Sequence, residues 1–281
     1  MDILNKMNIE QLTTLIEEFN LSEHREEIFK TIRPAISIAL KQVGQGEIGQ
    51  SRIGGIPDLP ASIPWLKDSI NGEYLCFILQ INLADLPAFP ENPFPKQGML
   101  YLFVNDGENN PEQLIFYNGK EPLQPVTLPQ DNLFITDWYE DLVVHCLEFH
   151  HILDLPRWAT EDYYQLCNRL NLDEEKLADL GTSLSQNSIG KLLGHVSGIG
   201  HDPREDAYIV REIDPKLPYS YKRHGSLELA QIQNWCNLLE LDSDDSLNLM
   251  FGDAGYLQVL IQQQKLQQLD FSSVYVNLES S

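Results

Sequence analysis

Two short apolar segments in distant parts of the chain resemble each other, and they constrain the fold more than any other feature. Residues 98–104 (GMLYLFV) align without gaps on residues 255–261 (GYLQVLI), with glycine first and leucine third in both. A strand-like segment precedes each, LQIN at residues 79–82 and LELD at residues 239–242. Because repeats reveal architecture before single elements do, we predict an internal duplication of two related β-rich halves. The alternative is two β-hairpins that look alike by chance.

Strand-like runs gather in the first half of the chain. Apolar, β-prone residues fill residues 74–81, 98–104 and 114–117, and the last run ends at an Asn-Gly turn signal. Residues 41–64 contain too many glycines and prolines for a helix interior. We therefore predict strands joined by turns and connectors in this part of the chain.

Helical spacing of apolar residues appears in two other stretches. It runs over residues 8–33 and over residues 161–180, where Gly181 is the expected stop. Strands and helices that gather in separate stretches are typical of an α+β fold. The expected organisation is one compact domain made of an N-terminal helical segment at residues 1–40, a first repeat at 41–160 and a second repeat at 161–281, with helices flanking the strands.

The chain carries a large excess of acidic residues. Its 281 residues include 42 Asp and Glu against 19 Lys and Arg, which gives a net charge of −23. Nucleic acids and anionic membrane surfaces attract basic patches, so neither is an expected partner. The charge favours a basic protein partner, because long-range attraction accelerates such an encounter.

Signals for export and for membrane insertion are not apparent. The N-terminal residues lack the basic patch and apolar run of a secretion signal, and no apolar run approaches the roughly 20 residues that span a bilayer. Four cysteines, at positions 76, 146, 167 and 236, form no CxxC pair and lie among apolar neighbours. We expect a soluble, cytoplasmic protein.

A set of motifs runs along roughly residues 50–275. SRIGGIPDLP at residues 51–60 precedes Trp65 in the first half, and KLLGHVSG at 191–198 and FGDAG at 251–255 lie in the second. Together with the LQIN strand, these motifs resemble the YwqG-like family of bacterial proteins, whose function is unassigned. The resemblance implies an α+β fold with two related halves and leans toward an immunity-like or regulatory role.

The chain departs from the family pattern at several positions, and the family supplies no catalytic residue. The departures are Leu66, His195, Glu240 and Phe251, where the family usually has proline, glycine, glutamine and tryptophan.

No constellation of residues predicts catalysis. A GxGxxG match at residues 44–49 has the outline of a dinucleotide fingerprint, but glycines and a proline follow at once and no helix can begin there. His145 and Cys146 are adjacent, so on a strand their side chains point to opposite faces. We expect a protein that is not an enzyme, although a site without recognisable spacing stays possible.

One acidic stretch has the spacing of a calcium loop. Asp242, Asp244 and Asp253 fall at positions 1, 3 and 12 of such a loop, with Ser246 and Asn248 between them. A leucine replaces the glycine of the sharp turn, and the flanking segments are strand-like. A strand-connecting loop with exposed carboxylates is the preferred interpretation, and calcium binding is the alternative.

Five residues are candidates for binding a ligand or a partner. Arg52 and Arg204 can each receive a carboxylate or phosphate, although pairing with an internal acid is the preferred interpretation. Trp65 is either a core anchor or a rim aromatic. Gln80 and Glu240 are polar positions within apolar strands, at equivalent places of the two repeats, which predicts a site at the seam between the halves.

Two functions follow from these observations. The first is an interaction module that docks a basic partner without catalysis. The alternative is a small-molecule or divalent-metal-binding protein with its site at the seam between the halves.

Overall fold

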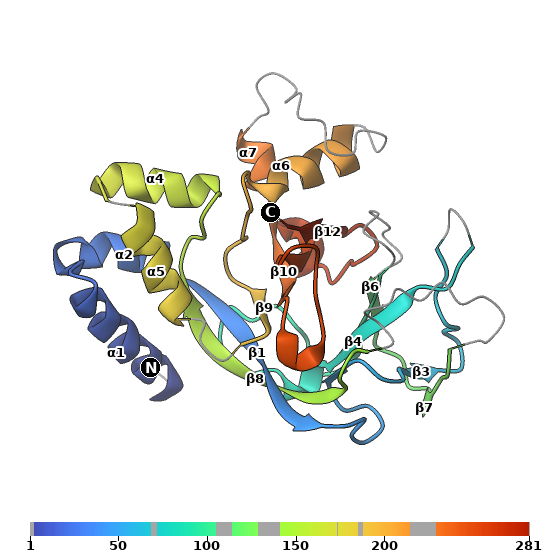
Figure 1. The fold of residues 1–281 in the computed structure, drawn as a ribbon. Helices are drawn as coiled ribbons and strands as arrows, with labels where there is room; N and C mark the ends of the chain where they lie inside the picture. Colours follow the sequence, from blue (N-terminus) through green and yellow to red (C-terminus); the bar gives the residue numbers. More distant parts are fainter. Residues whose placement is uncertain are drawn as a thin grey trace.

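A large antiparallel sheet organises the molecule. The computed structural model describes residues 3–68, 72–104, 114–128, 141–172, 174–184, 188–213 and 229–280. The strands in these residues are β1 (Arg33–Val43), β2 (Arg52–Ile53), β3 (Asp58–Pro60), β4 (Cys76–Asn82), β5 (Met99–Val104), β6 (Leu114–Tyr117), β7 (Leu123–Pro125), β8 (His145–Asp154), β9 (Gly190–Leu193), β10 (Trp235–Asp242), β11 (Tyr256–Gln262) and β12 (Tyr275–Glu279). Ten of them form one curled sheet in the order β12-β11-β10-β9-β1-β8-β2-β4-β5-β6, and β3 pairs with β7 (Figure 1).

The helices are shorter elements that flank this sheet. They are α1 (Ile3–Glu18), α2 (Arg25–Thr31), α4 (Glu161–Leu170), α5 (Glu174–Leu184), α6 (Pro203–Tyr208), α7 (Leu229–Ile232) and α8 (Gln263–Gln267), with the single turns η1 (Ser22–His24), η2 (Leu83–Asp85), η4 (Ile209–Ile213) and η5 (Asp245–Leu247). The molecule is therefore an α+β protein, as predicted. None of these helices is long and apolar enough to cross a membrane.

The sheet has two wings on either side of a central pair of strands. We call β2, β4, β5 and β6 the first wing, β9 to β12 the second wing, and β1 with β8 the central pair. In the first wing Gln80 pairs with Tyr101, and the register shifts after Phe77. In the second wing Glu240 pairs with Gln258, and the register shifts at the corresponding place, between Asn237 and Leu239. The two segments that align in sequence therefore have the same register in their wings.

Strand β1 corrects the prediction of a helical segment over residues 1–40. Helices α1 and α2 are present, but the chain becomes a strand at Arg33 and pairs with both β8 and β9. Ile36 and Ile38 are completely buried in the core. The helical spacing before Ile32 is a local signal, whereas the partners of β1 lie more than 100 residues away in the sequence. Spacing alone could not show where the helix ends.

The predicted helix over residues 161–180 is two helices. Thr160 caps the N-terminus of α4 by accepting from the N–H of Tyr163, and Asn171 ends the helix in a left-handed conformation. Gly181, the expected stop, lies inside α5 instead. Helices α1, α2, α4 and α5 form what we call the helical layer, which packs on the end of β8 through an apolar cluster that includes Leu12, Ile28 and Leu153.

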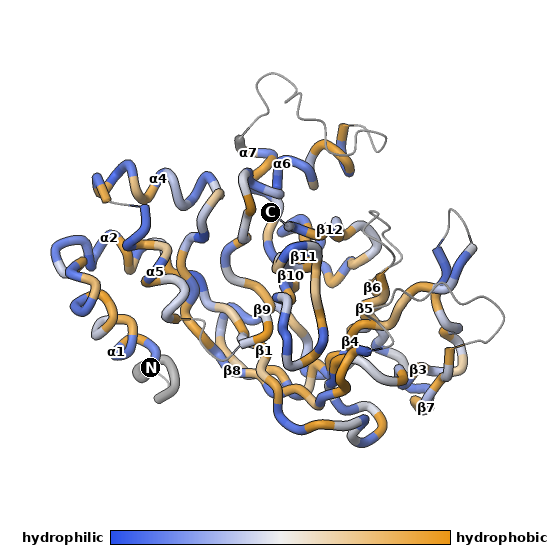
Figure 2. Tube along the Cα trace, in the orientation of Figure 1, coloured by the Kyte–Doolittle hydropathy of each residue, from blue (hydrophilic) through white to orange (hydrophobic). Residues whose placement is uncertain are grey.

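Apolar side chains cover both faces of the sheet, but unequally. The main core fills one face along both wings, and the tube in Figure 2 is most apolar along strands such as β4 and β5. On the other face of the first wing, Trp65, Phe77 and Phe103 form a second cluster. On the other face of the second wing the apolar cluster is smaller, centred on Trp235 and Tyr275. Polar side chains occupy the rest of that face.

Candidate functional site

Arg52 and Gln80 lie together in a hydrogen-bonded cluster of the first wing. Arg52 is completely buried, and its Nη1 donates to Asp58 Oδ2 at 2.7 Å. Gln80 donates to the same oxygen at 3.0 Å and accepts from the Asp58 N–H at 2.8 Å. The hydroxyl of Tyr101 donates to the Asp58 carbonyl at 2.6 Å. Burial raises the pKa of Asp58, but the hydrogen bonds from Arg52 and the Gly49 N–H outweigh it and leave that pKa lowered.

Trp65 belongs to the core of the first wing. Its side chain is buried, and its indole N–H donates to the Leu75 carbonyl at 2.7 Å. The ring meets Phe103 edge to face with centroids 5.6 Å apart. The structure thus places Trp65 over the same face as Gln80, as a cover on the sheet.

The second wing has a different ionic cluster at the corresponding place. Lys191 on β9 stands opposite Glu240, as Arg52 stands opposite Gln80. Its Nζ donates to Asp154 Oδ2 at 2.9 Å and lies 3.7 Å from Glu240 Oε1. Arg157 donates to the other oxygen of Asp154 at 2.7 and 3.0 Å. Burial raises the pKa of Asp154, but Arg157 and Lys191 outweigh it and hold that pKa well below the usual range.

Six polar side chains share one face of the second wing, and we call this set the acidic face. The pairing of β10 with β11 and of β11 with β12 sets Glu240, Gln258 and Asn277 in one row across the strands. The same pairing sets three further side chains in a second row, two residues away from the first row along each strand. These are Asp242, Tyr256 and Glu279.

The acidic face holds carboxylates with perturbed protonation and polar atoms without partners. Burial and the neighbouring Glu240 raise the pKa of Asp242 to about 6. Burial raises the pKa of Glu279 to about 7, although His201 opposes the shift. The hydroxyl of Tyr256 and Oε1 of Gln258 are buried and have no hydrogen-bond partner among the described residues. Perturbed carboxylates beside unsatisfied polar atoms are features of functional sites.

Arg204 is held by two carboxylates away from the other predicted binding residues. The side chain is buried, donates to Asp202 at 2.5 to 3.1 Å and lies 3.2 Å from Asp162 Oδ2. These contacts connect the start of α6 to α4. His195 is close by, with Nδ1 3.8 Å from the same oxygen of Asp162, and burial lowers its pKa despite that carboxylate.

The three aspartates of the predicted calcium loop have different environments. Asp242 lies on the acidic face. Asp244 caps η5, and its Oδ1 accepts from the N–H of Ser246 at 2.8 Å. Asp253 is exposed in the turn before β11. No group of three His, Cys, Asp or Glu side chains in the described ranges is arranged to hold a metal ion. Calcium binding stays a prediction.

The GxGxxG match lies in a loop, and His145 and Cys146 lie on a strand. Residues 44–49 form a loop between β1 and β2, and no helix follows them, as predicted. On β8 the thiol of Cys146 contacts the Gly44 carbonyl, whereas His145 Nδ1 lies 3.2 Å from the Val143 carbonyl. The two side chains thus engage different groups.

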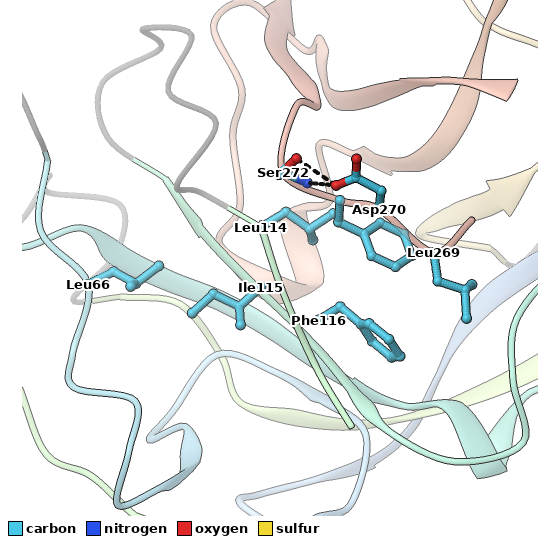
Figure 3. A pocket seen from close by; sticks show the side chains of 8 residues that line it. Leu66, Leu114, Ile115, Phe116, Leu269, Asp270 and Ser272 are labelled. Atoms are coloured by element: carbon cyan, nitrogen blue, oxygen red, sulfur yellow. Dashed lines mark hydrogen bonds between the residues drawn. The ribbon is translucent and has the colours of Figure 1, made fainter. Parts of the chain in front are cut away.

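The sequence predicted that Gln80 and Glu240 mark a site at the seam between the halves, but the two residues do not lie together. Those residues are separated by four strands of the sheet, β9, β1, β8 and β2. Where the two wings approach each other, a pocket of about 360 Å³ lies between β6 and the segment after α8 (Figure 3). Phe116 and Phe271 meet there with centroids 5.3 Å apart. The polar side chain of Asp270 is engaged with Ser272, so this pocket is lined mainly by apolar groups.

Several residues in and beside the second wing were not predicted from the sequence. Asp154, Lys191, Tyr256, Gln258 and Glu279 carry the ionic cluster and the acidic face, yet only Glu240 and Asp242 were candidates. Lys191 and Gln258 interrupt short apolar runs, GKLLG and YLQVLIQ, by the same signal that singled out Gln80. Asp154 gave no such signal because it ends its strand.

The fold and the polar clusters define the class of protein. This is an α+β protein whose two-winged antiparallel sheet carries a buried ionic cluster in each wing and an acidic face in one. The chain belongs to the family described as Domain of unknown function (DUF1963), which matches residues 51–279. No curated protein matches the sequence. The family description names no activity, and the YwqG-like resemblance stays a prediction.

Proposed function

We propose that this protein is a non-catalytic interaction module that docks a basic protein partner on its helical layer. The observation that carries the proposal is the distribution of charge on that layer. Its exposed carboxylates are Glu10, Glu17, Glu18, Glu23, Glu26, Glu174, Glu175 and Asp179. Among the described residues, the exposed basic side chains of these helices are fewer: Arg25, Lys30, Arg169 and Lys176. Lys30 and Arg169 both pair with Glu27, which is not one of the eight carboxylates.

Two of these carboxylates stand where they cost stability. Glu17 and Glu18 occupy the last turn of α1, which carries no basic residue. The C-terminal end of a helix bears a partial negative charge, and an acidic side chain there is repelled by it. No hydrogen bond or ion pair of the described residues uses either carboxylate. Acids that occupy an unfavourable position without a structural contact favour a role in recognition.

The test is a charge reversal that should weaken binding without weakening the fold. We expect wild-type protein to capture a basic protein from a lysate of its source organism at low ionic strength. The captured protein should dissociate at about 0.5 M salt, where screening shortens electrostatic range to roughly 4 Å. The Glu17→Lys/Glu18→Lys variant should capture at least tenfold less, while unfolding at the same or a slightly higher temperature.

A matched variant separates a specific surface from overall charge. Glu47→Lys/Glu91→Lys changes the net charge equally at exposed positions outside the helical layer, and it should capture the same protein as wild type. If both variants lose the partner alike, or if the captured proteins are not basic, the docking surface assigned to α1 is wrong.

We also propose that the two wings arose by internal duplication. The shared register supports this origin, and so does the backbone after the first strand of each wing. In the first wing Gly54 and Gly55 come directly after β2, with φ of 70° and 75°. In the second wing Leu193 is the last residue of β9 and Gly194 comes after it, with φ of 63° and 76°. Leucine rarely adopts this left-handed conformation, so its presence favours inheritance of a turn built for glycine.

A further inference from the structure

The acidic face of the second wing can be compared, position by position, with the same face of the first wing. Glu240 and Gln258 correspond to Gln80 and Tyr101 in register. In the first wing both ends of the Gln80 amide are hydrogen-bonded, and the Tyr101 hydroxyl donates to a carbonyl. The row is therefore closed by the protein itself.

The second wing leaves the corresponding row open. Gln258 is completely buried, and its Nε2 donates to Glu240 Oε2 at 3.0 Å and to the Ser197 carbonyl at 3.3 Å. Within the described part of the chain its Oε1 has no partner, and the buried hydroxyl of Tyr256 has none either. A buried acceptor without a donor costs free energy unless another molecule supplies the donor. From this contrast between two related faces we propose that the acidic face binds a positively charged nitrogen group, a primary ammonium or a guanidinium.

The local charge fits such a group. Lys191 and Arg157 are both bound to Asp154. Lys191 also lies near Glu240, but no basic side chain of the described residues forms an ion pair with Asp242. Glu279 adds a further carboxylate to the same face. An incoming cation relieves the repulsion among these carboxylates, and its N–H groups reach acceptors that the protein leaves unused.

The approach is from the Asp242 end of the array. Asp242 and Tyr256 are half-buried, whereas Glu240 and Gln258 are buried. The Asp244 carboxylate acts on Asp242 from the following loop, and it adds negative potential at this end.

A nitrogen cation fits this arrangement better than a metal ion. A metal requires several oxygen ligands converging at about 2.0–2.6 Å, and the described residues contain no such group of carboxylates. N–H donors are directed outward from one nitrogen group and can each reach a separate acceptor. The acceptors available are carboxylates on β10 and β12 and an amide oxygen on β11 between them.

The test uses small probes with full-length protein. The probes are n-butylammonium, n-butylguanidinium, neutral 1-butanol, calcium, and the peptide Gly-Gly-Lys-Gly-Gly with its N-acetyl-lysine counterpart, both with blocked termini. Titration calorimetry and thermal unfolding measure binding, because a ligand of the native state raises the unfolding temperature. We expect saturable binding of at least one cationic probe and none of butanol or acetyl-lysine peptide. Binding by butyl cations indicates a small-molecule site, and binding by the lysine peptide alone indicates a protein side chain.

Asp242→Asn is the decisive variant, and Asp245→Asn is its matched control. The first keeps the shape but removes a carboxylate of the acidic face, and the second makes the same change at an exposed position of η5. Asp242→Asn should weaken the cationic probe at least tenfold, and Asp245→Asn should leave it within twofold. Gln258→Leu, which removes the unpartnered oxygen, should also weaken it.

Three outcomes overturn the proposal. In the first, no cationic probe binds, so that the unpartnered atoms are only hydrated. In the second, Asp242→Asn binds the probe as wild type does. In the third, calcium binds, Asp242→Asn abolishes that binding and the nitrogen cations do not compete. None of these outcomes bears on the helical layer, so the docking of a basic partner is judged separately.

Discussion

Asp154 shows how single residues hold this fold together. Its two oxygens accept from Arg157, from Lys191 and from the backbone N–H of His195, and it is almost completely buried. Removing one partner of such a cluster leaves the others as buried, uncompensated charges, which typically costs about 3–5 kcal/mol. The cluster is thus structural. The acidic face beside it is different, because Lys191 is the basic side chain that pairs with Glu240, whereas Asp242 and Glu279 form no ion pair among the described residues.

Asp242 should make stability fall as pH rises from about 4 to about 6. Its pKa is raised from 3.8 to about 6 by burial and by Glu240. The stability that this carboxyl contributes is therefore complete below pH 4 and lost as pH increases through 6. The Asp242→Asn variant, which has no charge to bury, should gain on wild type across this window, by about 1–3 kcal/mol at pH 8.

The measurement is the free energy of unfolding in urea at intervals between pH 4.5 and 8. The quantity to follow is the difference in unfolding free energy between the variant and wild type as a function of pH. A constant effect of the amide shifts this difference equally at every pH and does not change its slope. Asp245→Asn should parallel wild type throughout. A difference between Asp242→Asn and wild type that stays constant with pH would show that Asp242 does not titrate in this range.

Sequence reasoning found part of the candidate site, for a reason visible in particular residues. Gln80 and Glu240 stood out because a polar residue inside an apolar strand needs a buried partner. The pairing of Arg52 and Arg204 with internal acids was also the preferred interpretation, and the structure has both pairs. What sequence could not show was that Gln80 is satisfied and Gln258 is not. That depends on Asp58, Ser197 and other partners that the fold brings in from distant segments.

At the scale of elements, the end of β9 is the most constrained backbone near the site. Gly194 has φ of 76°, and a Cβ placed on it would lie 2.5 Å from Asp154 Oδ2 and 2.9 Å from the Cβ of Ala35. That oxygen is held by Lys191, and it cannot move without breaking the ionic cluster. The turn after β9 thus requires both a left-handed conformation and the absence of a side chain.

Gly194→Ala should therefore destabilise more than backbone strain alone explains. The matched variant is Gly200→Ala, since Gly200 has φ of 79° and an added Cβ there would have no other atom within 4 Å. Both variants carry the conformational cost of the left-handed region, but only the first has the steric conflict. We expect Gly194→Ala to lose about 1–3 kcal/mol more than Gly200→Ala, measured by urea unfolding. Equal losses would mean that the contact with Asp154 relaxes freely.

The elements themselves were predicted unevenly. Strands β4, β5 and β6 follow from short apolar runs, and β6 begins and ends where expected. Strand β1 was missed because RPAISIALKQV follows a helical pattern directly, and its identity depends on β8 and β9. Gly181 was misassigned as a helix stop. It is a buried residue inside α5 whose carbonyl accepts from Arg157 Nη1 at 3.3 Å, and this contact with a distant residue is not visible in local sequence.

At the scale of the whole molecule, the central pair joins the two wings. The family match begins at residue 51, but β1 precedes it and lies between β8 and β9. A chain reduced to the matched region would therefore lack a strand from the middle of its sheet. The sheet of this chain therefore extends beyond the region that matches the family.

A pair of truncations tests this conclusion. A chain of residues 45–281 should show no cooperative thermal transition by circular dichroism, because β8 and β9 lose the strand between them. A chain of residues 33–281 keeps β1 and loses α1 and α2, so it should retain a transition at a lower temperature. Cooperative unfolding of the shorter chain at the wild-type temperature would contradict the central role of β1.

The position of β1 also has a consequence for synthesis. Ile38 pairs opposite Phe149, so a ribosome must add about 110 residues after β1 before its first partner exists. At roughly 5–20 residues per second this takes about 5–20 s. During that interval the nascent chain carries an unpaired strand with two isoleucines destined for the core. We therefore expect β1 to be the part of the nascent chain that is most open to wrong pairing until β8 has been made.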